Sequence, residues 1–332
     1  MVSTRPIVVA GAGSVGCFVG GLLAAGGRSV SLLARPRVLA EIEQNGLRLT
    51  GFNGLERRVP AALIRLSDHP SILRDAAMVL VTVKSMDTAA MADQIAAHAP
   101  GDAIVVSLQN GIANREVLRS RCSGRVLAGM VPFNIMALGE GHYHQATSGD
   151  IALEQDEAGT AAQLAVEGLA VRTVPDIVAV LWGKLLLNLN NALNALSGLP
   201  LRDQLAQRPW RLLLADQMTE ALQVLKAEGI VPAAASGVAP RFIPHILRLP
   251  DALFRVVSGG AMRIDASARS SMWEDLQRRR PTEIDFLQGA VVALAERHGI
   301  DVPLTRRVMA LVTAAEREKT GSPGLRPDQV RG

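Results

Sequence analysis

The sequence predicts an α/β protein in which a doubly wound parallel sheet is followed by an all-helical second domain. Short apolar runs alternate with helical patterns in the first half, and a glycine-rich turn follows the first run. From about residue 175, long helical patterns replace this alternation. A chain of 332 residues is long enough for two domains of roughly 150 residues each. We therefore expect domains at residues 1–175 and 176–332, the second ending in a loose polar tail from residue 320.

The first half contains four expected strands. Ile7–Ala10 is an apolar run that leads into the glycine turn, and further runs lie at 29–34, 78–83 and 103–108. Continuous apolar runs are typical of strands that helices cover on both faces. The helix after the turn is indicated by apolar residues at offsets 0, 3, 4, 7 and 8, and a crossover helix is expected at 87–98. The apolar residues of that first helix are Val15, Phe18, Val19, Leu22 and Leu23.

The second half is expected to form helices at 176–196, 208–228, 281–298 and 303–318. The chain is 48% hydrophobic but only 3% aromatic, so its cores must consist mainly of leucine, valine, isoleucine and alanine. An apolar face of the helical half would serve a homodimer, although nothing in the pattern requires one.

Composition excludes several classes of protein. The net charge is +4, and the basic residues are spread along the chain, so neither a basic tail nor an aromatic-interleaved patch indicates nucleic acid. No apolar stretch approaches the roughly 20 residues of a membrane span, and no signal peptide is apparent. Cys17 and Cys122 form no C-x-x-C pair, and His142 and His144 have no third ligand nearby. We expect a cytoplasmic protein without a metal, whose mild positive charge suits anionic substrates.

The glycine-rich turn GAGSVG has the G-x-G-x-x-G spacing of a dinucleotide site, and it lies between an expected strand and an expected helix. Gly11 would allow the tight turn, Gly13 would let the backbone approach a pyrophosphate, and Gly16 would let helix and strand pack closely. The N–H groups at the start of the helix would bind the phosphates. The cofactor contacts are therefore predicted at Gly11, Ala12, Gly13, Ser14, Val15 and Gly16.

Arg35 indicates which dinucleotide is bound. NAD-binding versions of this unit carry an acidic residue at the end of the second strand, but here that position is Arg35, and the next acid is Glu41. A guanidinium there would pair with a 2′-phosphate, which predicts NADP(H). Lys84 and Asn110 follow the third and fourth expected strands, at the sheet edge where such folds bind ligands. A solvated arginine, an ordinary loop lysine and an Asn-Gly turn remain the alternatives for these three positions.

Lys184 is the candidate for chemistry. The residues around it are apolar on all sides of the expected helix, which indicates burial, and burial lowers the pKa of an ammonium group. Asn188 and Asn191 follow at offsets 4 and 7, on the same face of that helix. A buried ammonium needs a carboxylate, and Glu283 lies on the apolar stripe of a later expected helix, while Ser271 adds a hydroxyl. The alternative is a lysine that extends to solvent.

Taken together, these segments resemble the ketopantoate reductase (2-dehydropantoate 2-reductase) family. The matching segments run in order through nearly the whole chain: GAGSVG, Arg35, VTVKS, SLQNGI, WGKLLLN, SSM and RPTEID. The resemblance implies a Rossmann-type domain followed by a helical domain. It also implies an oxidoreductase that acts on a CH–OH group with NADP as acceptor, and that reduces ketopantoate to pantoate in pantothenate and coenzyme A biosynthesis.

The resemblance also implies roles for individual residues. Lys184 would be the general acid that protonates the C2 oxygen of the substrate, and Glu283 would orient the substrate and interact with the lysine. Arg35 and Lys84 would contact NADPH. The substrate would be held by Asn110, Asn188, Asn191, Ser271 and Glu283.

Two departures from the family pattern weaken the assignment of the substrate. Ala192 stands where relatives have a second substrate asparagine, for which Asn191 or Asn194 would have to substitute, and Asp87 replaces an amide. A reductase of another 2-keto acid is therefore one alternative. The other is a regulator that binds NADP(H) without catalysis, in which Lys184 and Glu283 would have no reason to face each other.

Overall fold

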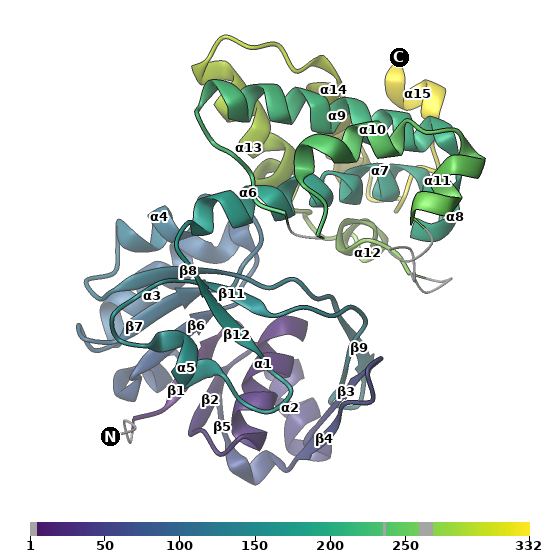
Figure 1. Cartoon of the computed structure of the whole chain (residues 1–332). Coiled ribbons are helices and arrows are strands. Elements are labelled where there is room, and N and C mark those ends of the chain that lie inside the picture. Colours follow the sequence, from purple (N-terminus) through teal and green to yellow (C-terminus); the bar gives the residue numbers. More distant parts are fainter. Residues whose placement is uncertain (1–4, 235–236, 259–267) are drawn as a thin grey trace. The chain divides into compact units, whose positions relative to one another are not determined.

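The computed structural model describes residues 5–234, 237–258 and 268–332 (Figure 1). The chain divides into two compact units, Met1–Ile177 and Val178–Gly332, so the division lies two residues after the expected boundary. Unit 1 is built on sheets and unit 2 on helices. This arrangement confirms the predicted fold class.

The main sheet of unit 1 has the strand order β12-β11-β8-β7-β6-β1-β2-β5. Neighbouring strands pair in parallel from β8 to β5, whereas β11 is antiparallel to β8 and parallel to β12. The four strands expected from the sequence are β7, β6, β1 and β2, which are consecutive neighbours. The strands are β1 (Ile7–Ala10), β2 (Val30–Leu33), β5 (Ile64–Ser67), β6 (Met78–Val81), β7 (Ile104–Ser107), β8 (Val126–Met130), β11 (Ile151–Glu154) and β12 (Val171–Val174).

Helices cover both faces of this sheet, which explains why its strands are continuous apolar runs. Val9 packs in a cluster with residues of α1 and α2, while Val8 packs in a second cluster with residues of α3 and α4. The helices of unit 1 are α1 (Ser14–Ala25), α2 (Pro36–Asn45), α3 (Thr88–His98), α4 (Asn114–Arg119) and α5 (Thr160–Leu164), with short 3₁₀ turns η1 (Ala61–Leu63), η2 (Pro70–Asp75) and η3 (Ser85–Asp87).

A second, smaller sheet has the order β4-β3-β10-β9 and was not expected from the sequence. Its strands are β3 (Leu47–Gly51), β4 (Glu56–Val59), β9 (Ile135–Gly139) and β10 (His142–Gln145). His142 and His144 share one face of β10, where Nε2 of His142 and Nδ1 of His144 lie 2.8 and 2.7 Å from the Thr50 hydroxyl. Within the described residues there is no cluster of three or more side chains that could hold a metal ion.

The described residues of unit 2 form helices and connecting loops. None of the helices described in the chain is long and apolar enough to span a bilayer. The helices of unit 2 are α6 (Ile177–Asn188), α7 (Asn190–Ser197), α8 (Leu201–Ala206), α9 (Arg208–Ala227), α10 (Ile243–Leu247), α11 (Asp251–Ser258), α12 (Ser271–Gln277), α13 (Ile284–Arg297), α14 (Pro303–Glu318) and α15 (Pro327–Arg331), with the 3₁₀ turn η4 (Pro240–Phe242).

Two of the expected helices differ from the structure. The single helix expected at 176–196 is divided into α6 and α7 at Leu189, whose carbonyl accepts a hydrogen bond of 3.0 Å from the buried amide of Gln288. The helix expected from Pro281 begins only at Ile284, because the Thr282 hydroxyl accepts the Ile284 N–H at 3.2 Å. Glu283 is therefore the N-cap residue of α13 and not, as expected, a residue inside the helix, although its carbonyl still accepts the Leu287 N–H at 3.1 Å.

The C-terminal tail is packed, although a loose tail was expected. The Leu325 N–H donates to the Leu196 carbonyl at 2.8 Å, and the Ser322 hydroxyl donates to the Ala195 carbonyl at 2.7 Å. Val330 is fully buried, and α15 ends the chain as a short helix. The polar composition of residues 320–332 suggested a loose tail, because composition does not show that a few specific hydrogen bonds hold the segment.

Candidate active site

The glycine-rich turn connects β1 to α1, and two of its glycines are required by the protein itself. Gly11 has a φ of +88°, and a Cβ there would overlap the side chain of Val83. A Cβ on Gly16 would lie 2.5 Å from the Thr82 hydroxyl and 3.0 Å from Val9 Cγ1. The Thr82 hydroxyl donates to the Gly11 carbonyl at 2.9 Å and so holds the turn against β6.

Gly13 is different, because no close contact within the protein requires a glycine at this position. It is exposed and forms the N-cap of α1, and a Cβ there would meet only the Gly11 carbonyl, at 3.9 Å. In the described part of the chain, no side chain caps α1 and its first turn is without acidic residues. The helix N-terminus, formed by the partly exposed Ser14 and Val15, therefore has an open approach for an anion, whereas Ala12 is buried. These features fit the pyrophosphate of a dinucleotide.

Arg35 directly follows the second strand of the expected unit. It is exposed and forms the N-cap of α2. Glu41, the nearest acid in the sequence, accepts the Gly141 N–H at 2.9 Å and pairs with Arg37 at 3.4 Å. A guanidinium rather than a carboxylate thus occupies the position that recognises the adenosine ribose in this fold.

Lys84 and Asn110 lie in the loops that follow β6 and β7, and hydrogen bonds join these two loops. The Ser85 hydroxyl donates to the Asn110 carbonyl at 2.8 Å, and the Asn114 side-chain amide donates to the same carbonyl at 2.5 Å. Both loops leave the carboxyl ends of adjacent parallel strands. The structure therefore brings Lys84 and Asn110 to one edge of the sheet.

A buried amide and a buried hydroxyl extend this network. The amide is that of Gln109, in the SLQNGI segment, and the hydroxyl is that of Thr88, which lies in none of the matching segments. The Gln109 side chain donates to the Val83 carbonyl at 3.0 Å and to the Thr88 hydroxyl at 2.7 Å. The Thr88 hydroxyl in turn donates to the Asn114 side chain at 2.7 Å. The sequence pattern assigns Gln109 no role of its own, and Thr88 is one of many polar residues at the start of a helix, which are too common to single out.

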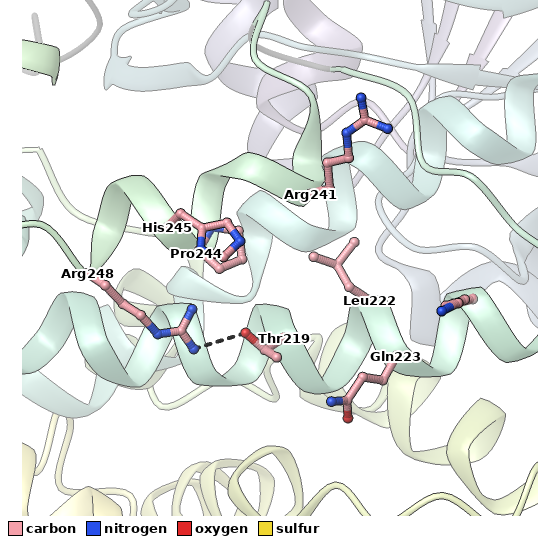
Figure 2. Close-up of a pocket in the computed structure, with 8 residues that line it drawn as sticks. Thr219, Leu222, Gln223, Arg241, Pro244, His245 and Arg248 are labelled. Atoms are coloured by element: carbon pink, nitrogen blue, oxygen red, sulfur yellow. Dashed lines mark hydrogen bonds between the residues drawn. The ribbon is translucent and has the colours of Figure 1, made fainter.

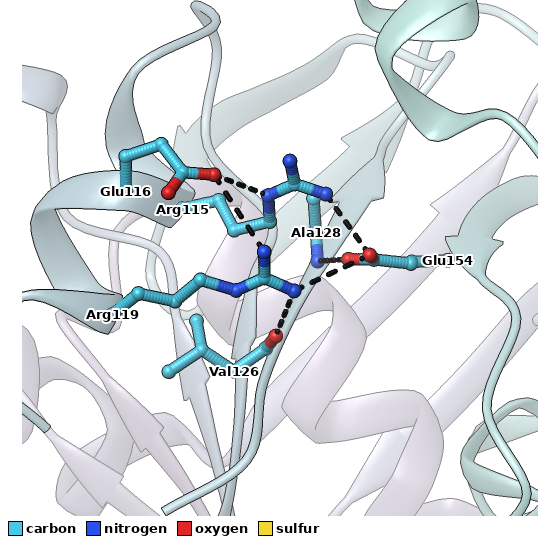
Figure 3. Close-up of polar contacts among 6 residues, drawn as sticks. All are labelled: Arg115, Glu116, Arg119, Val126, Ala128 and Glu154. Atoms are coloured by element: carbon cyan, nitrogen blue, oxygen red, sulfur yellow. Dashed lines mark hydrogen bonds and ion pairs between the residues drawn. The ribbon is translucent and has the colours of Figure 1, made fainter. Parts of the chain in front are cut away.

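An ion-pair cluster anchors α4, the helix that follows Asn110, to the sheet (Figure 3). The Glu154 carboxylate on β11 pairs with Arg115 at 2.9 Å and Arg119 at 3.4 Å, both on α4. Its other oxygen accepts the Ala128 N–H of β8 at 3.0 Å, and Arg119 donates to the Val126 carbonyl at 3.3 Å. The cluster fixes the end of the loop that carries Asn110.

In unit 2, Lys184 lies on α6 close to a loop that follows α9. A Cβ on the preceding residue, Gly183, would overlap the Ala233 carbonyl, and the Ala233 N–H donates to the Ala179 carbonyl at 2.8 Å. Glycine is therefore required at position 183 for this close approach of backbone to helix.

Lys184 is partly buried between apolar neighbours and interacts with Glu283. Burial lowers the pKa of the Lys184 ammonium, and the negative charge of Glu283 opposes part of this shift. The resulting pKa is about 8. The N-cap of α13 thus places a carboxylate near the amine, as expected, although not by the expected helical stripe. An ammonium with this pKa is suited to donate a proton near neutral pH.

The other predicted substrate residues of unit 2 lie at the ends of helices. Asn188 is the last residue of α6, Asn191 is near the start of α7, and both are partly exposed. Ser271 is exposed as the first residue of α12. Its neighbour Ser270 is buried, caps α12 through the Trp273 N–H at 3.1 Å, and donates to the Asn191 carbonyl at 3.0 Å.

Asn194 is a structural residue, and this answers one question left open by the sequence. Its side chain is 0% exposed and donates to the Leu199 carbonyl at 2.9 Å and the Gln204 side chain at 3.0 Å. Its oxygen accepts the Ser270 N–H at 2.9 Å. Because these bonds occupy the amide, the structure disfavours Asn194 as the substitute for the missing substrate asparagine, one of the two alternatives left open by the sequence.

Comparisons with known proteins agree with this arrangement. The family model described as "Ketopantoate reductase PanE/ApbA" matches residues 7–157, and its C-terminal counterpart matches residues 176–316. A 2-dehydropantoate 2-reductase of Halobacterium salinarum is 30% identical over 322 residues, which are 94% of this chain and 99% of that protein.

Two solved structures share the fold. A PanE/ApbA family ketopantoate reductase from Ralstonia eutropha JMP134 has a TM-score of 0.80 at 33% identity, over 94% of this chain and 99% of that chain. A D-mandelate dehydrogenase, solved with NADH and anilino(oxo)acetate, has a TM-score of 0.76 at 20% identity, over 94% and 99%, which shows the fold alone. The family matches cover both units of the chain. The chain is therefore an oxidoreductase that belongs to the ketopantoate reductase family.

Proposed function

We propose that this protein reduces ketopantoate to pantoate with NADPH, as a step in pantothenate and coenzyme A biosynthesis. The observation that carries the proposal is the Lys184 ammonium, whose pKa is lowered to about 8 beside the Glu283 carboxylate. The same pairing disfavours a regulator without activity, which would not need a proton donor of tuned pKa. The family supports the choice of substrate.

Lys184 is the general acid in this proposal. Reduction of a 2-keto acid generates negative charge on the C2 oxygen, and a protonated amine beside that oxygen stabilises the charge and then transfers its proton. Glu283 keeps the amine protonated by raising its pKa against the effect of burial. After the transfer, an amine with a pKa of about 8 takes up a new proton readily from water near neutral pH.

The cofactor is assigned to residues of unit 1. The turn from Gly11 to Gly16 and the N-terminus of α1 hold the pyrophosphate, and Arg35 and Lys84 hold the phosphates of NADPH. When bound, NADPH supplies the hydride to C2 of the substrate. Asn110 is held rigidly by the network around Ser85 and Asn114, which allows it to orient ligands with little loss of entropy.

The substrate is assigned to Asn188, Asn191, Ser271 and Glu283, together with Asn110. Their amide and hydroxyl groups are the donors and acceptors that a hydroxylated keto acid requires. Asn191 is the proposed replacement for the second substrate asparagine, because it is partly exposed while Asn194 is enclosed.

The proposal is tested by following NADPH absorbance after ketopantoate is added. We expect turnover with NADPH and much poorer turnover with NADH. Opine-forming enzymes need an amine as a second substrate, so turnover without any added amine also distinguishes the reaction from opine formation. Absence of NADPH oxidation at any ketopantoate concentration would overturn the proposal.

The second candidate function is the reduction of a different 2-keto acid. It is favoured because Ala192 lacks the amide of the family pattern and Asn194 does not replace it. A less polar pocket would favour a keto acid with a less polar side chain. A panel of 2-keto acids ranked by kcat/KM decides between the two. A higher kcat/KM for a keto acid without the hydroxyl group would favour the second candidate.

A further inference from the structure

Unit 2 contains a pocket outside the proposed active site, between α9 on one side and η4 with α10 on the other (Figure 2). Its volume is about 310 Å³, near the lower end of the range for small-molecule sites. None of its residues has a role in the proposed reaction. The lining residues are Thr219, Leu222, Gln223, Lys226, Arg241, Pro244, His245 and Arg248.

The pocket is positively charged. Lys226, Arg241 and Arg248 contribute three cations. Among the described residues that line the pocket, none is acidic. A concave surface lined by charges of one sign concentrates the counter-ion, so the pocket attracts anions.

The carboxylate that pairs with Arg248 does not neutralise this charge. Asp216 pairs with Arg248 at 2.8 Å, but its second oxygen pairs with Arg331 at 2.7 Å. One carboxylate thus serves two guanidinium groups, which leaves a net positive charge. The Arg208 side chain adds further positive charge, since it donates two bonds of 3.2 Å to the Arg248 carbonyl.

Two of the cationic side chains are held in place before a ligand arrives. The Arg248 guanidinium donates to the Asp216 carboxylate and, at 3.0 Å, to the Thr219 hydroxyl, as Figure 2 shows for Thr219. The Arg241 guanidinium lies over the Phe242 ring, 4.8 Å from its centroid. Donors that are already ordered lose less entropy when an anion binds.

The floor of the pocket is apolar. Leu222 and the buried Pro244 lie between the basic side chains of α9 and α10, so a ligand also meets hydrocarbon. A hydrated inorganic ion would gain little from this surface, whereas a short organic body would. Guanidinium and ammonium groups together are the usual partners of a phosphate group.

We propose that this pocket, formed by α9, η4 and α10, is a second binding site of the protein for a small organic phosphate. Its phosphate group pairs with Lys226, Arg241 and Arg248, and its carbon skeleton packs on Leu222 and Pro244. The proposal is independent of the proposed function, because the two share no residue.

The test is calorimetric titration of the full chain with glycerol 3-phosphate, in the presence of saturating NADPH so that the cofactor's phosphate site is filled. The pocket variant Lys226→Gln/Arg241→Gln removes two charges from exposed positions. Its matched control, Arg317→Gln/Lys319→Gln, removes the same two charge types from the exposed end of α14, outside the pocket. We expect wild type and control to bind with equal affinity and the pocket variant to bind at least about tenfold more weakly.

A second variant keeps the proposal testable if the first variant does not fold. Gln223→Glu keeps the shape of an exposed lining residue but adds a negative charge, so it should weaken binding of glycerol 3-phosphate as well. Titration with glycerol alone should give no heat, because the phosphate group carries the recognition. Equal affinity in wild type and both pocket variants would overturn the proposal, as would no binding to wild type at millimolar concentrations.

Discussion

The two units of the chain position their candidate site residues in different ways. In unit 1 these residues follow the carboxyl ends of β1, β2, β6 and β7, which are consecutive neighbours in one sheet. In unit 2 they lie at or near the ends of helices, and Lys184 is inside α6. The first arrangement follows from parallel pairing alone, because the same end of every strand meets one edge. The second depends on where each helix begins and breaks.

The two units also differ in the kind of polar interaction that surrounds their candidate site residues. In unit 1, neutral hydrogen bonds from Ser85, Gln109 and Asn114 hold the loops that carry Lys84 and Asn110. In unit 2, a cation sits in an apolar environment beside a carboxylate, and its pKa is shifted strongly. A scaffold that binds needs fixed dipoles, whereas a group that transfers a proton needs a tuned pKa. The largest effects on catalysis are therefore expected in unit 2.

The substitution Lys184→Ala should reduce kcat by about 10²- to 10⁴-fold, the usual loss on removing a general acid. NADPH affinity, measured by fluorescence titration, should remain near the wild-type value because the cofactor residues belong to unit 1. The exposed Lys319→Ala is the matched control and should leave kcat unchanged. A Lys184→Ala enzyme with full kcat would remove this residue from the mechanism and reverse the assignment of roles to the two units.

The substitution Arg35→Ala should raise the KM for NADPH by about 10- to 100-fold, because it removes a charge-assisted pair to the 2′-phosphate. The KM for NADH should change little, so the preference between the cofactors should shrink. Arg65→Ala, which also removes an exposed arginine of unit 1, provides the control. If both cofactors were affected equally, Arg35 would act on the fold and not on the 2′-phosphate.

The sequence predicted unit 1 well wherever regular burial determines the pattern. The runs at β1, β2, β6 and β7 are apolar because helices cover both faces, and that pattern is visible residue by residue. The small sheet was missed because its strands alternate buried and exposed positions over only four or five residues. The glycine-rich turn was predictable because Gly11 and Gly16 satisfy strict local geometry.

In unit 2 the sequence predicted the main helices, but not every position where a helix begins or ends. At the division between α6 and α7, the Leu189 carbonyl accepts from Gln288, which lies 99 residues away along the chain. The N-cap position of Glu283 depends on one hydroxyl, that of Thr282. The packed tail depends on hydrogen bonds to Ala195 and Leu196. Such long-range contacts leave no periodic signal, so helix periodicity alone overestimated the lengths of the helices.

The substitution Glu283→Gln tests whether the charge of Glu283 raises the pKa of Lys184. Lys184 must be protonated to donate, so kcat should fall as pH rises through its pKa of about 8. The Glu283 charge raises that pKa, and its removal should therefore move the alkaline fall of kcat to lower pH. Glu296→Gln, on the exposed part of the same helix, is the control. An unchanged alkaline limb would show that the two groups are not coupled in the working enzyme.

The smallest expected effects on kcat come from Asn191 and Asn194 of α7, and the two substitutions distinguish an effect on substrate binding from an effect on folding. Asn191→Ala should raise the KM for ketopantoate by about five- to tenfold without a loss of stability, since one neutral hydrogen bond to substrate is removed and its own carbonyl still accepts from Ser270.

Asn194→Ala should do the opposite. It leaves the Ser270 N–H and Oε1 of Gln204 without the Asn194 amide as a buried partner, so the free energy of unfolding should fall by about 1–3 kcal/mol, measured by urea denaturation. Its kinetic constants at low temperature, where the fold remains intact, should stay close to wild type. The reverse outcome, a stable Asn194→Ala enzyme with a raised KM, would mean that this amide turns toward the substrate. In that case Asn194, and not Asn191, would replace the missing asparagine in the proposed substrate site.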